Sequence, residues 1–240
     1  MIPPIAVLLP ILFLGGIVST ISGGGLGILL TIASTFFVDV RVSIVLVSLL
    51  GFIIQAAKIA HFSQHTRWNI VGWYLLLGVP MSFIGALFLF LLPVRVIEIA
   101  LATLCIVYIL VHVLHLRPKV QASITNLILL GGFNGLVGGV VGHGSLLRLP
   151  TLLAFGLTKE QFVATSSVIA FLMNAGKSVV YVQQFSWSQD AFILFLCAAP
   201  TVFVGVWIGK KLLKYVSPMV FENLLLGIVF LGAVRLLFFT

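Results

Sequence analysis

Long apolar stretches, broken by glycine, proline or charge, run through most of this chain. We read them as helical segments in two sets, because a chain in lipid has no water to satisfy an open backbone edge. The first set is Ile5–Ser22, Leu26–Val38, Val42–Ser63, Ile70–Leu92 and Val96–Leu116. The second set is Ser123–Val141, Ser145–Phe155, Gln161–Gln184, Ala191–Leu213 and Val220–Phe239. The pattern therefore predicts an all-α polytopic membrane protein.

The second segment of each set is too short to span a bilayer. Leu26–Val38 has 13 residues and Ser145–Phe155 has 11, whereas about 20 residues are needed to cross the hydrocarbon core. Each short segment follows a glycine break, Gly23–Gly25 in the first set and Gly142–Gly144 in the second. We therefore expect the first two segments of each set to form a glycine-broken hairpin, either re-entrant or fully spanning.

The two sets align with each other. A shift of 119 residues superimposes the two glycine breaks and gives twelve identities over the 53 positions from Gly16 to Trp68. The identical pairs include Ser48 with Ser167, Phe52 with Phe171, Lys58 with Lys177 and Trp68 with Trp187. A tandem duplication accounts for this similarity. It predicts two membrane repeats, residues 1–117 and residues 118–240.

Composition supports the membrane assignment. Of the 240 residues, 61% are hydrophobic and 8% are charged, whereas a soluble domain carries about a quarter charged residues. There is too little polar surface to cover a water-exposed globule, which excludes a disordered chain, a nucleic-acid-binding domain and an ordinary soluble enzyme. The formal net charge of +8 is then expected to set orientation, because basic residues collect in cytoplasmic loops.

The positions of these basic residues favour one of two topologies. If each short segment returns to its starting side as a hairpin, one side collects Arg67, Arg117, Lys119, Lys159, Lys210, Lys211 and Lys214. The other side then holds Arg41, Arg95 and Arg235. A single long crossing by the first two segments would instead divide these residues six to four. The hairpin topology gives the larger bias, so we expect inverted repeats in the cytoplasmic membrane, with both termini outside.

The glycine breaks are candidate anion sites. The helix that follows each break has first-turn N–H groups without helical partners and a positive dipole end, and anions bind at such ends. The candidate residues are Gly24 and Gly25 in the first break and His143, Gly144 and Ser145 in the second. Close helix packing through small residues is the alternative explanation.

Three cations within apolar segments, Lys58, Arg148 and Lys177, have no acidic residue at similar depth. Ionisable groups inside a membrane are functional candidates, and a transported anion would serve as their counter-ion. Arg148 lies one turn past the second break, and its guanidinium fork suits a carboxylate or sulfonate. Lys58 is five residues from a segment end, so it could instead extend its ammonium to the interface.

Polar side chains accompany these cations. Gln55 and Asn174 each precede a repeat-equivalent lysine by one turn, and Ser167 lies on the same helical face as Asn174 and Lys177. Hydroxyl and amide donors could complete an oxyanion shell, or they could form hydrogen bonds between helices. His143 could donate to an anion or carry a proton, because its pKa lies near neutrality.

The chain resembles the TauE/SafE sulfite exporter family of anion permeases. The resemblance rests on Gly23–Gly27, Gly142–Pro150, the run Ala164–Ser167 and the stretch Asn174–Ser178. It covers nearly the whole chain, and it implies an integral inner-membrane carrier for sulfite, organosulfonates or related small anions.

The sequence as a whole predicts a secondary transporter of a small anion, sulfite or an organosulfonate, that works by alternating access. An anion channel using the same site remains an alternative. We predict no enzyme activity, because Ser145 lies only two residues from His143 and no membrane-embedded acidic pair is present. We also predict no cofactor, no metal site and no nucleic-acid partner. Membrane lipid, a coupling proton or cation, and a second copy in a homodimer are the other partners considered.

Overall fold

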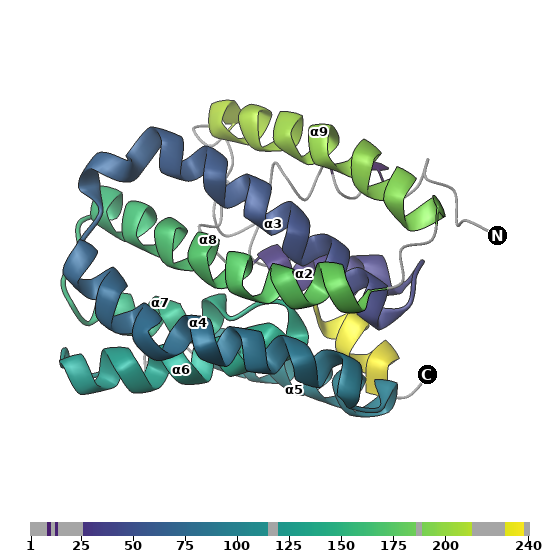
Figure 1. The fold of residues 1–240 in the computed structure, drawn as a ribbon, viewed down its shortest axis with the longest axis horizontal. Coiled ribbons are helices and arrows are strands. Elements are labelled where there is room, and N and C mark those ends of the chain that lie inside the picture. Colours follow the sequence, from purple (N-terminus) through teal and green to yellow (C-terminus); the bar gives the residue numbers. More distant parts are fainter. Residues whose placement is uncertain are drawn as a thin grey trace. The chain divides into compact units, whose positions relative to one another are not determined.

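The computed structural model describes residues 26–114, 120–185, 189–212 and 229–237, together with Leu9, Pro10 and Phe13. Within these residues the regular secondary structure is helical, with no strand (Figure 1). The α-helices are α2 (Leu26–Thr35), α3 (Val40–Phe62), α4 (Trp68–Leu91), α5 (Val94–Val113), α6 (Ile124–Val141), α7 (Ser145–Leu153), α8 (Lys159–Gln184) and α9 (Gln189–Leu212). A short 3-10 helix, η1 (Ser63–His65), links α3 to α4, and residues 229–237 are also helical.

These helices agree with the predicted segments to within a few residues. The helix α7 is confirmed as short, with 9 residues, whereas α2 has 10 residues within the described part, which begins at Leu26. The predicted segment Ile5–Ser22 lies outside the described residues apart from Leu9, Pro10 and Phe13. The first glycine break also lies outside them, as does most of Val220–Phe239.

Five helices of the described part are long and apolar enough to cross a membrane. These spans are Val40–Ala60, Trp68–Leu91, Val94–Val111, Ile124–Val141 and Glu160–Gln184. The helix α4 buries the small residues Gly78, Ser82 and Ala86 and exposes Leu76 and Phe88. Large side chains facing outward and small ones facing inward suit a lipid solvent, where helices associate through close packing. The protein is a multi-pass membrane protein.

The described helices belong to two compact units. Unit 1 comprises Met1–Leu50, Pro93–His115 and Ser186–Thr240, and unit 2 comprises Gly51–Leu92 and Leu116–Phe185. Unit 2 thus combines α4 and the second half of α3, from the first predicted repeat, with α6, α7 and α8 from the second. A repeat boundary is a property of the sequence rather than of packing, so the division at residue 117 stays a prediction.

In unit 2, α4 and α6 run side by side (Figure 1), and the backbones of the two helices approach each other closely. Three glycines at four-residue spacing on α6 each face a carbonyl oxygen of α4, so that an added Cβ would overlap it. Gly131 faces Tyr74, Gly135 faces Gly78, and Gly139 faces Ser82. Such spacing of small residues allows two helices to approach more closely than larger side chains permit.

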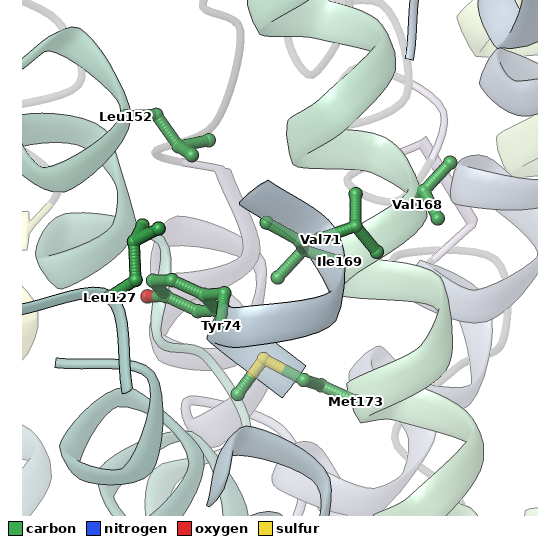
Figure 2. Packing of buried hydrophobic residues seen from close by; sticks show 7 residues of the cluster. All are labelled: Val71, Tyr74, Leu127, Leu152, Val168, Ile169 and Met173. Carbon is green, nitrogen blue, oxygen red and sulfur yellow. The ribbon is translucent and has the colours of Figure 1, made fainter. Parts of the chain in front are cut away.

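A buried apolar cluster joins these two helices to α7 and α8. Figure 2 shows its buried members, with the ring of Tyr74 between Leu127 and Met173. The second half of α3 also contacts α8, where the rings of Phe52 and Phe171 stack with their centroids 4.3 Å apart. Unit 2 is therefore held by apolar contacts that come from helices of both predicted repeats.

In unit 1, two arginines bond to carbonyl groups near helix ends. Arg95, at the start of α5, forms an ion pair with the buried Glu98 (3.3 Å) and donates to the carbonyls of Leu236 (2.9 Å) and Leu237 (2.6 Å). Arg235 donates to the carbonyl of Thr35, the last residue of α2. The start of α5, the end of α2 and residues 235–237 thus lie at the same end of unit 1.

Candidate functional site

The break between α6 and α7 is shaped by its glycines. Gly142 ends α6 with φ at 86°, in the left-handed region where glycine carries no steric cost. Gly144 precedes α7, and a Cβ at this position would overlap Asn134 Oδ1. Gly138, one turn before the end of α6, packs directly against the backbone of Gly144. The chain can therefore reverse tightly here only because these positions lack side chains.

Lys177 is bound to the end of α6 at this break. Its side chain lies on α8 with only 3% of the residue exposed, and its ammonium donates to the carbonyls of Gly138 (3.3 Å) and Gly142. One turn further along α8, the Tyr181 hydroxyl donates to the carbonyl of Gly139. The C-terminal end of a helix carries partial negative charge, so a lysine ammonium stabilises it.

Arg148 lies one turn into α7 and is also buried, at 8% exposure. Its Nε donates to the Ser166 hydroxyl on α8 (2.9 Å). Its two terminal amino groups have no hydrogen-bond partner among the described residues. The positive charge of Arg148 acts electrostatically on Lys58, His143 and Lys177. Two buried cations, Arg148 and Lys177, therefore lie within electrostatic reach of each other at this break.

Carboxylates are scarce in unit 2. Its sequence contains seven lysines and arginines, at positions 58, 67, 117, 119, 148, 159 and 177, and one acidic residue, Glu160. Glu160 is exposed in the first turn of α8, and Lys177 lies 17 residues further along that helix, about 25 Å away. The described residues of unit 2 therefore provide no counter-ion for the positive charges at the break, although burying unpaired charges is costly.

The break also contains the other residues predicted for the second glycine turn. His143 is partly buried between α6 and α7. Loss of hydration, together with repulsion from Lys177 and Arg148, lowers the pKa of His143 well below its usual value. Its ring is therefore neutral at pH 7. Ser145 begins α7, whereas Gly24 and Gly25 of the first break lie outside the described residues.

The remaining predicted site residues lie on α3 and α8. Ser167 is buried, but it follows Ser166 by one residue and so points about 100° away from it around α8. Asn174 is partly buried against Gly51 of α3. Gln55 and Lys58 are partly buried on α3. Lys58 lies within electrostatic reach of Arg148. No hydrogen bond among the described residues joins Gln55, Ser167 or Asn174 to the break.

Two residues at this break were not predicted from the sequence. They are Tyr74 of α4 and Asn134 of α6, both almost completely buried. Asn134 carried a detectable signal, because an amide inside an apolar, glycine-rich segment is uncommon and needs a partner. Tyr74 carried none, since an aromatic residue in an apolar segment usually serves packing.

A comparison with known protein families identifies the family to which this chain belongs. The sequence model of the sulfite exporter TauE/SafE family matches residues 8–236. The chain belongs to the TauE/SafE family. No curated protein and no solved structure matches the chain.

This assignment confirms the resemblance seen in the sequence. TauE/SafE proteins form a family of transporters and not of enzymes. Membership in this family implies that the substrate is a small anion and that the protein works in a membrane. A family of exporters also favours a carrier over an anion channel. The match from residue 8 to residue 236 includes both glycine breaks, so the break at Gly142–Gly144 belongs to the region shared with the TauE/SafE family.

Proposed function

We propose that this protein is a secondary carrier that moves sulfite or an organosulfonate across the cytoplasmic membrane by alternating access. The observation that carries the proposal is the pair of buried cations, Arg148 and Lys177, at a glycine break in a unit whose single acidic residue is exposed. A transported oxyanion would supply the missing negative charge. Its release on either side then exposes the cations to water.

The binding site would be built on the second break. The terminal amino groups of Arg148 suit two oxygens of one anion. Lysine has three N–H donors, and the Lys177 ammonium gives two of them to α6 carbonyls, which leaves a third for the anion. The first-turn N–H groups of α7, from Ser145 onward, and the neutral ring of His143 would add donors from the positive end of that helix.

The other predicted residues would form the outer part of the site. Gln55, Ser167 and Asn174 would orient the anion as it moves, and Lys58 would attract it from the side of α3. Gly24 and Gly25 stay predicted members of an equivalent anion site at the first break. We propose that a proton or cation moves with the anion and that the carrier is a homodimer.

Arginine contacts in unit 1 support the hairpin topology. In that topology Arg95, Arg235 and the end of α2 share the outer side of the membrane. If the first two segments of each repeat formed one long crossing, Arg235 would lie on the opposite side from Arg95 and Thr35. The bonds from Arg95 to Leu236 and Leu237, and from Arg235 to Thr35, fit the first arrangement and therefore support it.

The stacking of Phe52 on Phe171 supports an inverted relation between the repeats. These two phenylalanines are equivalent positions under the 119-residue shift, and their rings are in contact. Equivalent residues of two copies touch only near a two-fold axis that relates those copies, and inverted repeats are related by such an axis in the membrane plane. We place that axis between α3 and α8.

The test is transport by purified protein in proteoliposomes with labelled sulfite and methanesulfonate. Arg148→Ala should abolish saturable transport, lowering kcat/KM by about 100-fold or more, because each of the two hydrogen bonds from the guanidinium to the anion contributes about 1.5–3 kcal/mol and each 1.4 kcal/mol is tenfold. The folded fraction should stay intact, since the variant removes an unpaired buried charge.

The matched control is Arg67→Ala, which removes an exposed arginine of the same unit just before α4. It should keep saturable transport. Transport by Arg148→Ala at the wild-type rate would remove Arg148 from the site. Single-channel currents through the purified protein in a planar bilayer would show that it is a channel and not a carrier.

A further inference from the structure

Two buried polar groups in unit 2 take no part in the site proposed above. They are the hydroxyl of Tyr74 on α4 and the amide oxygen of Asn134 on α6, in residues that are 0% and 1% exposed. Neither atom has a hydrogen-bond partner among the described residues. Buried polar atoms in native proteins nearly always have a partner, so this pair needs an explanation.

Both groups lie at the glycine break. Asn134 Oδ1 covers Gly144 so closely that no Cβ would fit there. Tyr74 packs in the same apolar cluster as Met173, whose sulfur the Asn134 side chain contacts, and Tyr74 lies within electrostatic reach of Arg148. The Tyr74 ring is held in the apolar cluster between Leu127 and Met173 (Figure 2). Three helices, α4, α6 and α7, therefore bring a hydroxyl, an amide and a guanidinium to one place.

The chemistry of these three groups suits an oxyanion with three oxygens. The Tyr74 hydroxyl can donate one hydrogen bond, and the free amino groups of Arg148 can donate to a second oxygen. The Asn134 NH2 group now points at the sulfur of Met173, 3.6 Å away. A thioether is a weak acceptor, so a half-turn of the amide would exchange this contact for a stronger bond to an anion above Gly144.

We propose that Tyr74 and Asn134 are substrate-binding residues that, with Arg148, each hold one oxygen of the transported anion at the start of α7. This inference rests on the proposed carrier function and adds its specificity. A sulfite or sulfonate group satisfies all three donors. A carboxylate has two oxygens in one plane, so it cannot place a separate oxygen at each of three donors from three helices, and a site built for hydrogen bonding penalises such a poor fit.

The test measures binding of sulfite, methanesulfonate and acetate to purified protein in detergent, by calorimetry and by thermal shift. The wild-type protein should bind the two sulfur oxyanions and should bind acetate at least tenfold more weakly. Tyr74→Phe keeps the ring and its packing, and it should weaken methanesulfonate binding by tenfold or more. The midpoint of thermal unfolding of this unligated variant should not fall, because the hydroxyl has no partner to lose.

The matched control is Tyr181→Phe, which removes a buried hydroxyl that donates to Gly139. It should keep wild-type affinity and lower the unfolding midpoint. Asn134→Leu, of similar volume, should lose affinity as Tyr74→Phe does.

Wild-type affinity in both Tyr74→Phe and Asn134→Leu would overturn this assignment while the carrier function stood. A Tyr74→Phe variant that lost stability as Tyr181→Phe does would assign the hydroxyl a structural role and overturn it as well. A wild-type protein that bound neither sulfur oxyanion would overturn the proposed function itself.

Discussion

At the scale of single residues, Lys177 has a structural partner that the sequence could not show. Its charge predicted a counter-ion for the substrate, and its ammonium is bound to the carbonyls of Gly138 and Gly142. These carbonyls belong to the last turn of α6, where a cation is favoured by the helix dipole. Lys177 therefore stabilises the glycine break and, in our proposal, also offers its remaining donor to the anion.

Replacement of Lys177 tests the structural part of this role. In Lys177→Met the two α6 carbonyls lose their donor, so the free energy of unfolding should fall by roughly 1–3 kcal/mol. Thermal unfolding in detergent measures this change without any substrate. The comparison variant is Arg148→Ala, which removes one hydrogen bond, to Ser166, together with a buried charge, so its unligated stability should fall less. A Lys177→Met variant as stable as the wild type would show that the carbonyl contacts contribute little.

The sequence predicted the charged part of the site better than the neutral part. Arg148 and Lys177 stood out because an apolar segment without nearby carboxylates makes an arginine or lysine conspicuous. The pairing of Tyr74 with Asn134 depends on α4 lying against α6. Those two helices come from different predicted repeats, so no local pattern of residues contains that contact.

At the scale of helices, hydropathy predicted the boundaries to within a few residues, and the structure shows the capping residues that set them. Ser123 accepts a hydrogen bond from the Asn126 backbone N–H (3.2 Å) and so begins α6, while Gly142 ends it. Thr158 and Gln161 form a capping box at the start of α8, which places that start two residues before the predicted one. Hydropathy alone misses such a shift, because capping residues are polar.

The packing of α4 on α6 gives a prediction at this scale. Gly135→Ala places a Cβ against the Gly78 carbonyl, so the free energy of unfolding should fall by about 1–3 kcal/mol, the usual cost of overpacking. The control is Gly72→Ala on α4, where an added Cβ meets nothing within 4 Å. That variant should be neutral or more stable by up to about 1 kcal/mol. Thermal unfolding of both purified variants measures the difference, and equal stabilities would contradict close backbone packing.

At the scale of the whole molecule, the two compact units each draw helices from both predicted repeats. Unit 2 joins α4 of the first repeat to α6, α7 and α8 of the second, and unit 1 joins α2 of the first to α9 of the second. The exchange of the fourth segments is what we expect when two copies are related by a two-fold axis, whereas α5 and residues 229–237, from the fifth segments of the two repeats, both lie in unit 1. Repeat length could be read from the sequence, but this exchange could not, because it depends on contacts between the copies.

The topology can be tested by fusing reporter proteins to the chain in a bacterial inner membrane. The hairpin and single-crossing topologies both place the termini outside, and they differ at residue 119. Green fluorescent protein fused after Lys119 should fluoresce, because the hairpin topology places this loop in the cytoplasm. The same reporter after Thr240 should stay dark and serves as the control. A dark fusion after Lys119, with active alkaline phosphatase at the same point, would contradict inverted repeats.

The contact between the α4 and α6 backbones has a mechanical consequence. Where carbonyl groups meet glycines, no side chain is present that could change rotamer and let one helix slide along the other. We therefore expect α4 and α6 to move as one rigid body throughout the transport cycle. The helix that moves relative to them is then α7, which has 9 residues and is joined to α6 by the glycine break. A cross-linker between α4 and α6 should leave the turnover rate untouched, whereas one between α6 and α7 should stop it.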